Sequence, residues 1–226
     1  MRAARILGVA DALARDLARR ALALAFFFGL PMALYGLLAG GGPATSGWAP
    51  MAGTLMLGWG VAATAFFAGL DGREMDPRLV LAGYRPMELA VGRLVPIWLL
   101  GSVAALVAFA VMAVFTPLAH GGRLLGAVML AVGVAGPFGI AVAAVLPREL
   151  EGVLIMMAVV MAELVTPKLS GVSVVFPFFG VGELVSGALG WPGATVYRPV
   201  ALSGGWAIAL LGLAVFARRV RAALRP

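Results

Sequence analysis

Long stretches without a single charged side chain constrain this chain more than any other feature of its sequence. No Asp, Glu, Lys or Arg occurs in residues 21–70, 94–119, 124–146 or 199–217. A helix needs about 20 apolar residues to cross a hydrocarbon core of about 30 Å, so each stretch can span a membrane. The mean hydropathy of +1.04 and the hydrophobic content of 62% agree with this. We therefore expect an integral membrane protein.

The apolar segments predict six transmembrane helices. The first uncharged stretch is long enough for two crossings and contains its own turn, residues 40–50, and a further apolar run begins at Gly152. The segments lack the alternation of apolar and polar residues that barrel strands show, so we expect an all-α fold formed as one domain over residues 1–226. The predicted spans are residues 21–39, 51–70, 95–115, 124–146, 152–169 and 200–217.

The arginines indicate which helix ends face the cytoplasm, because cytoplasmic loops carry an excess of positive charge. Basic residues concentrate in the N-terminal segment, in residues 71–93, at Arg148 and in the C-terminal tail, whereas the opposite side receives only Arg123, Lys168 and Arg198. Both termini are therefore expected in the cytoplasm. The richness in Ala, Gly and Arg indicates a GC-rich bacterial genome, so the membrane is expected to be a bacterial plasma membrane. The net charge of +7 follows from this topology and requires no nucleic-acid partner.

Residues 2–20 predict an amphipathic helix. Ile6, Ala10, Leu13 and Leu17 recur at helical spacing and form one apolar stripe, whereas charged residues lie on the other faces. Such a helix is expected to lie along the inner membrane surface with its stripe toward lipid. It would serve either as an anchor for the first span or as an elbow that transmits motion of that span to a cytoplasmic partner.

Residues 71–93 form a charged connection between the second and third predicted spans. Asp76 and Pro77 suit the N-cap and first position of a short helix, which Gly83 can close in a left-handed conformation. A second helix then begins at Pro86, with an acidic residue in its first turn. Four acidic and four basic side chains balance one another in this hairpin. A balanced, capped hairpin suits docking into a protein groove better than binding to anionic lipid.

The order of residues in this hairpin resembles the coupling-helix region of type-2 ABC transporter permeases. An Arg-Glu pair follows the second span, and then come a leucine-bearing short helix, a Pro-x-Glu-Leu step and a Gly-Arg pair before the third span. The amphipathic N-terminal helix, the six spans and the basic tail extend the resemblance over nearly the whole chain. The matching residues are Arg73, Glu74, Leu79, Leu81, Pro86, Glu88, Leu89, Gly92 and Arg93.

The resemblance implies a permease that depends on a separate ATPase. The chain has no GxxxxGK[ST] phosphate-binding loop, so ATP and Mg²⁺ would bind to partner subunits and no cofactor to this chain. In such exporters two permease protomers, identical or related, pair above two copies of the ATPase, and closure of the ATPases drives export. The residues implied in contact with the ATPase are Arg73, Glu74, Arg78, Gly83, Tyr84, Arg85, Pro86 and Glu88.

Ionisable residues inside a span are functional candidates, because an unpaired charge in lipid is costly. Glu163 and Lys168 lie in the predicted fifth span, and Pro167 between them is expected to break or kink the helix. Glu163 would face a cavity or a subunit interface, or would serve only as a structural partner of Lys168 or of a neighbouring span. By the same resemblance, Glu183 is expected in a short re-entrant helical pair within residues 170–192, which would gate the exit of the translocation path.

The spans consist mainly of Gly, Ala, Val, Leu, Met and Phe, so the translocated molecule is expected to be hydrophobic or amphipathic, such as a drug, a natural product or a lipid-like compound. Two alternatives stay open. An ATP-independent secondary transporter would couple an ion gradient to buried carboxylates, and a haem-exporter membrane subunit has a similar length and six spans. An intramembrane enzyme would need several catalytic side chains at one depth, whereas the chain has one histidine, His120, and no cysteine. No metal site is expected.

Overall fold

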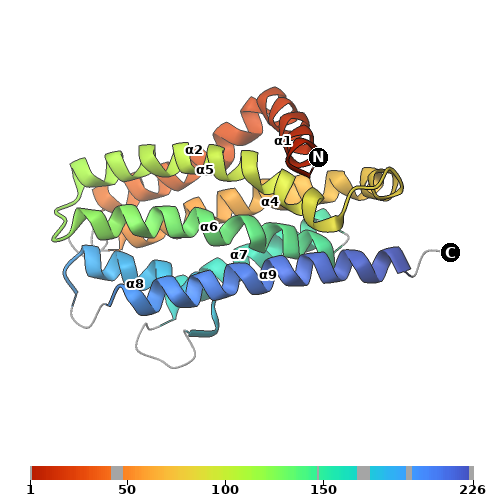
Figure 1. Cartoon of the computed structure of the whole chain (residues 1–226). Helices are drawn as coiled ribbons and strands as arrows, with labels where there is room; N and C mark the ends of the chain where they lie inside the picture. The colour runs from red at the N-terminus through yellow and green to blue at the C-terminus, as the bar shows by residue number, and fades with distance from the viewer. Residues whose placement is uncertain (1, 42–47, 147, 167–173, 192–194, 224–226) are drawn as a thin grey trace.

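The computed structural model describes residues 2–41, 48–146, 148–166, 174–191 and 195–223. Within these ranges there is no β-strand, in agreement with the predicted all-α fold. The long helices run side by side in one elongated bundle (Figure 1). In chain order the described helices are α1 (Arg2–Arg19), α2 (Ala21–Gly40), α4 (Ala49–Leu81), α5 (Pro86–Phe115), α6 (Gly121–Val145), α7 (Glu149–Val165), α8 (Phe179–Ala188) and α9 (Tyr197–Ala223).

Five of the described helices are long and apolar enough to cross a membrane. The chain is therefore a multi-pass membrane protein. Each of these helices covers one of the spans predicted from the sequence almost completely. The crossing segments are Ala21–Gly40, Ala49–Arg73, Pro86–Phe115, Gly121–Val145 and Tyr197–Val220.

The sixth predicted span, residues 152–169, corresponds to α7, which is shorter than the others. α7 has 17 residues. At 1.5 Å per residue its length is about 26 Å, less than the hydrocarbon core of about 30 Å. Residues 167–173 lie outside the described part of the chain, so the end of the predicted span does too.

The structure corrects the prediction of a separate short helix that begins at Asp76 and Pro77. α4 continues without a break to Leu81, and Pro77 lies inside it. A proline removes one backbone hydrogen bond and crowds the carbonyl group four residues earlier, which is why the sequence suggested a helix start. The side chains of Arg73 and Asp76 fasten the turn before the proline to neighbouring helices, and α4 therefore stays helical through it.

α4 and α6 form the centre of the bundle. In the most apolar part of α4, 94% of the residues are buried, compared with 11% in α2 and 17% in α9. The two central helices approach closely at Gly139 of α6, where a Cβ atom would overlap the carbonyl group of Ala62. A Cβ atom at Gly69 of α4 would likewise lie 2.7 Å from the Cβ of Ala143. Small residues thus bring the two backbones together, and such close packing is a main attraction between helices in lipid.

α1 is the amphipathic helix that the sequence predicts, but its apolar stripe packs on the protein itself. Ala10 and Leu17 are buried. The helix contacts α5 at Gly92, where a Cβ atom would lie 2.8 Å from the Cβ of Val9 and 3.0 Å from the carbonyl oxygen of Ile6, a residue of the stripe. The stripe is therefore used to fasten α1 to the end of α5, where the sequence alone suggested lipid as its partner.

The charged segments gather at one end of the bundle. Figure 1 shows the N-terminus, the turn between α4 and α5, and the C-terminal end of α9 on the same side. At the opposite end Trp48 directly precedes α4, Trp191 follows α8 and Tyr197 begins α9, and all three are exposed. The two Trp rings meet edge to face with their centroids 6.0 Å apart. Exposed Trp and Tyr are typical of a membrane interface, so the two ends of the bundle correspond to the two membrane surfaces.

Replacing Gly139 by Leu is expected to lower the free energy of unfolding by about 1–3 kcal/mol, the usual effect of overpacking, because the new side chain must push α6 away from α4. Gly212→Leu on α9 is a matched control, since nothing lies within 4 Å of a Cβ atom there. Thermal unfolding of the purified variants in detergent measures the difference. Equal midpoints for the two variants would contradict the close approach of α4 and α6.

Candidate functional site

A tight turn joins α4 to α5 at the charged end of the bundle. Gly83 has a φ of +87°, the left-handed conformation that the sequence predicts for it. The Tyr84 N–H donates a hydrogen bond to the Leu79 carbonyl at 3.0 Å, and the Gly83 N–H donates to the Val80 carbonyl at 2.9 Å. This pair of bonds is the Schellman motif that closes many helices. The predicted glycine closure is therefore confirmed, although it ends the long α4 and not a separate helix.

The beginning of α5 is capped in turn. Pro86 occupies its first helical position, as predicted, where the missing N–H leaves no bond unmade. The carboxylate of Glu88 accepts a hydrogen bond from the backbone N–H of Arg85 at 3.0 Å and is itself buried. With both flanking helix ends capped, the hairpin formed by α4 and α5 is a rigid projection.

α1 holds the tip of this hairpin through Arg5, a contact that the sequence analysis missed. Arg5 Nη1 donates a hydrogen bond to the carbonyl oxygen of Gly83 at 2.5 Å. The guanidinium carbon lies 5.4 Å from the centre of the Tyr84 ring, and Arg5 Nη1 lies 4.0 Å from the carboxylate of Glu88. One side chain of α1 therefore contacts the turn, its aromatic ring and the first turn of α5.

Arg73 points into the protein. Its guanidinium donates hydrogen bonds to the carbonyl oxygens of Ala143 and Leu146, the latter at 2.6 Å. These carbonyls belong to the C-terminal end of α6, where backbone acceptors lack partners within the helix. A cation is also favoured there by the negative end of the helix dipole. Arg73 therefore joins α4 to α6.

Asp76 is the centre of an ion cluster that joins three helices. Arg93 of α5 binds its carboxylate with both terminal nitrogens, at 2.5 and 3.1 Å. Arg218 of α9 approaches the same carboxylate at 3.0 Å. The side chains of Arg93, Asp76 and Arg218 are only 7%, 17% and 13% exposed. Charges with so little access to water require partners, so this carboxylate ties α4, α5 and α9 together.

Spacing rules could not have found this cluster, because its members lie on three different helices. From the sequence, Asp76 is expected to cap a helix, and Arg218 indicates only the topology. A weaker signal was present: Arg93 and Arg218 each border a long uncharged stretch. An arginine at the end of a membrane-spanning stretch extends its guanidinium either to water or to an acceptor inside the protein, so a buried partner is one of two expected outcomes.

The outward face of the hairpin is partly apolar. Leu81 is 89% exposed although it lies at the charged end of the bundle, and exposed arginines flank it. An exposed apolar group with a polar rim is typical of a surface that binds another protein. We call the exposed side chains at this end of the hairpin the tip surface, and they are those of Met75, Arg78, Val80, Leu81, Arg85 and Met87.

The residues predicted to contact a partner are thus divided between two roles. Arg78 and Arg85 are exposed on the tip surface. Arg73, Tyr84 and Glu88 contact other parts of the chain, and Gly83 and Pro86 shape the backbone of the turn. The side chain of Glu74 lies outside the described part of the structure.

Glu163 is buried in the last turns of α7, with 1% of its surface exposed. Its carboxylate accepts a hydrogen bond from the backbone N–H of Phe178 at 3.2 Å. Phe178 directly precedes α8, so the carboxylate lies at the N-terminal end of α8, where the helix dipole favours a negative charge. The Phe178 ring packs edge to face on Phe138 of α6, with centroids 5.8 Å apart. Glu163 therefore positions the beginning of α8 inside the bundle.

The other residues predicted for a translocation path are described only in part. Pro167 and Lys168 lie outside the described residues. Glu183 is half-buried on α8, and its Oε2 atom has no hydrogen-bond partner among the described residues. α8 ends at Ala188, whose carbonyl accepts a hydrogen bond from the backbone N–H of His120 at 3.1 Å. α8 thus runs from the bundle interior to the connection between α5 and α6.

No known protein family matches the chain, and no characterised protein is significantly similar to it. Within the part of the chain that the structure describes, no group of three or more His, Asp or Glu side chains could hold a metal ion. A function is therefore inferred from the hairpin, the ion cluster and the buried carboxylates alone.

Replacing Asp76 by Asn is expected to lower the free energy of unfolding by about 3–5 kcal/mol, because two poorly exposed guanidinium groups lose their shared carboxylate. Asp11→Asn on α1 is the matched control. Asp11 pairs with Arg15 at 2.7 Å, but both side chains are exposed, and such a pair contributes about 0–1 kcal/mol. Thermal unfolding in detergent tests this, and similar midpoints for the two variants would show that the cluster does not hold the helices.

Replacing Glu163 by Ala is expected to release the backbone N–H of Phe178 and to cost about 1–3 kcal/mol of stability. Hydrogen exchange at residues 174–182 should then be faster. Glu163→Gln keeps an acceptor oxygen and should preserve most of the protection. Equal exchange in both variants and in the unaltered protein would show that α8 does not depend on this carboxylate.

Proposed function

We propose that the chain is the membrane-spanning permease subunit of an ABC exporter in a bacterial plasma membrane. The observation that carries this proposal is the rigid hairpin between α4 and α5, with its partly apolar tip surface at the charged end. In this proposal α7 is the fifth of six spans, and both termini lie in the cytoplasm. ATP and Mg²⁺ bind to a separate ATPase subunit, which docks on the tip surface.

The chemistry of the tip surface suits a protein partner. Leu81 offers an apolar side chain for a pocket on the ATPase, and its high exposure leaves it free to enter one. Arg78 and Arg85 can pair with carboxylates around that pocket. An apolar centre with charged surroundings is the usual composition of a protein interface.

The contacts behind the tip surface suit the transmission of force. Arg5 fastens α1 to the turn, Arg73 fastens α4 to the end of α6, and Asp76 fastens α4 to α5 and α9. Because the hairpin is capped on both sides, a push on its tip is passed to these helices instead of being absorbed in the turn. ATP-driven closure of the ATPases would thereby reorient the spans.

The transporting unit in this proposal contains two permease chains, identical or related, and two ATPase subunits. The substrate is a hydrophobic or amphipathic molecule, such as a drug, a natural product or a lipid-like compound, since the bundle is built almost entirely of apolar side chains. Its exit lies near α8, where Glu163 and Glu183 are the acidic groups among the described residues of the outer half of the bundle.

A secondary transporter that needs no ATPase is the second candidate. One observation favours it: a carboxylate oxygen of Glu183 has no hydrogen-bond partner among the described residues. A carboxylate in that state could bind and release a coupling proton. Transport by purified protein in vesicles without ATP would support this candidate against the first.

The docking claim predicts that Leu81→Glu combined with Arg85→Glu releases the ATPase. The chain is expressed with a Walker-motif ATPase encoded beside it and purified in mild detergent, and the molar ratio of the two proteins is measured. We expect an equal ratio for the unaltered chain and at least a tenfold loss for the double variant, because the apolar contact is removed and the charge reversed.

Arg19→Glu provides the control for charge alone. Arg19 is exposed near the C-terminal end of α1, away from Arg5. Its replacement by Glu reverses one charge, as Arg85→Glu does, at a position outside the tip surface. It should leave the ratio unchanged. Full retention of the ATPase by the double variant would remove the tip surface from the interface, and the absence of any ATPase from the unaltered complex would remove the ABC proposal itself.

A further inference from the structure

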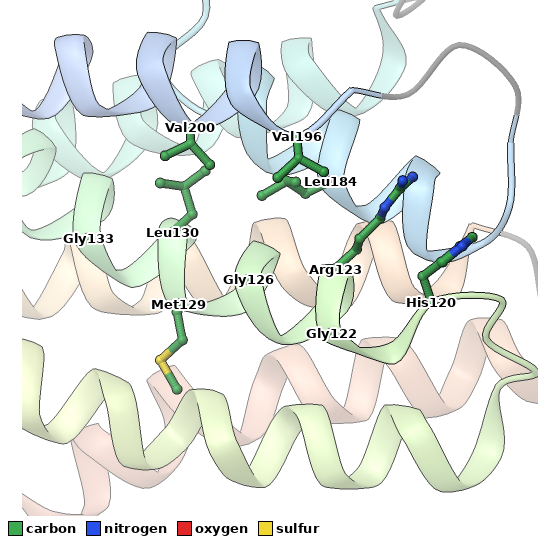
Figure 2. Close-up of a pocket in the computed structure, with 10 residues that line it drawn as sticks. All are labelled: His120, Gly122, Arg123, Gly126, Met129, Leu130, Gly133, Leu184, Val196 and Val200. Atoms are coloured by element: carbon green, nitrogen blue, oxygen red, sulfur yellow. The ribbon is translucent and has the colours of Figure 1, made fainter.

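A groove of about 770 Å³ lies on the outer half of the bundle, between α6, α8 and α9. Figure 2 shows that α6 provides most of its lining, while Leu184 of α8 and Val196 and Val200 close the opposite side. Among the described residues that line it, all side chains except those of His120 and Arg123 are apolar. The groove is at the opposite end from the tip surface and does not depend on the proposed function.

The groove exists because α6 carries glycines where side chains would otherwise fill it. Gly122, Gly126 and Gly133 are spaced so that they lie on one face of the helix. Among the described residues, nothing lies within 4 Å of a Cβ atom at Gly122 or Gly133, and at Gly126 only a methyl carbon of Leu184 does, at 3.9 Å. This face of α6 is therefore open, in contrast to the face that packs on α4.

The length of the groove matches one leaflet of a membrane. From Gly122 to Gly133 it follows α6 for about 17 Å, at 1.5 Å per residue. Half of the hydrocarbon core of a bilayer is about 15 Å. Its outer end lies beside the loop that holds His120, so it reaches from the outer membrane surface to about the middle of the membrane.

A basic side chain, Arg123, lies at the outer end of this apolar groove. Figure 2 shows Arg123 and His120 together at that end, with Leu130 and Val200 at the other. The Arg123 side chain is half-buried and has no hydrogen bond or ion pair with any described residue. A guanidinium without a carboxylate partner at a membrane surface is suited to bind a phosphate group.

We propose that the groove binds one anionic phospholipid of the outer leaflet, with an acyl chain between α6 and α9 and its phosphate at Arg123. His120 can donate a further hydrogen bond to the headgroup. A second copy of this chain fits less well, because it has no exposed carboxylate to bring to Arg123. In the outer half the described acidic residues are Glu163, which is buried, and Glu183, which is half-buried.

Native mass spectrometry of protein released from nanodiscs tests the site. The discs contain phosphatidylglycerol and phosphatidylethanolamine, and the ratio of the two lipids retained by the protein is measured. We expect enrichment of phosphatidylglycerol by the unaltered chain and about a fivefold smaller ratio for Arg123→Gln, which corresponds to about 1 kcal/mol for one basic residue near the membrane surface. Arg198→Gln removes an exposed outer arginine outside the groove and should change nothing.

Gly126→Phe tests the apolar part of the site independently of charge. The ring enters open space, and replacing a glycine raises helix propensity, so the variant is expected to fold. It should reduce the retention of both lipids. Unchanged lipid retention by Arg123→Gln and Gly126→Phe would overturn the proposal, as would a dimer that Gly126→Phe dissociates without changing the bound lipid.

A photoactivatable phosphatidylglycerol keeps the proposal testable if either variant fails to fold. The unaltered chain is irradiated in nanodiscs that contain this lipid, and the crosslinked peptides are identified. Crosslinks within residues 121–133 support the site. Crosslinks confined to other parts of the chain overturn it.

Discussion

The close approach of α4 and α6 is the contact on which the rest of the bundle depends. Apolar side chains gain little by moving from lipid to protein, so helices in a membrane associate where their backbones can come near one another. α4 meets its other neighbours in the same way: Gly60 faces the backbone of Phe27 on α2, and Gly152 of α7 faces the ring of Phe66. A helix buried on nearly every side is the scaffold against which the peripheral helices are placed.

Where the helices leave the apolar layer, arginine side chains hold them together in place of close backbone packing. Arg73 satisfies carbonyls at the end of α6, and Arg93 and Arg218 share the carboxylate of Asp76. These bonds are strong because the groups have little access to water, and each connects a different pair of helices. The inner side of the hairpin is occupied by such contacts, which leaves its outer face free to meet another protein.

Glycine serves two opposite purposes along α6. Gly139 permits contact with α4, whereas Gly126 and Gly133 leave an open face between α6 and α9. The two cases differ in whether a neighbouring helix packs directly against the glycine. The end of the bundle opposite the charged segments thus combines α8, a helix fixed by a buried carboxylate, with a groove in which Arg123 is the charged side chain among the described lining residues.

The sequence by itself determined that the chain crosses a membrane repeatedly, where five of the crossings lie, and how the turn at Gly83 and Pro86 is built. Those features depend on the length and hydropathy of a segment or on backbone preferences of neighbouring residues. Only the tertiary structure decided that α4 runs through Pro77, that Asp76 binds Arg218, and that the stripe of α1 packs on α5. Such contacts join residues on different helices. They stabilise the fold by more than the local backbone preferences that a sequence reveals, so they decide where the two disagree.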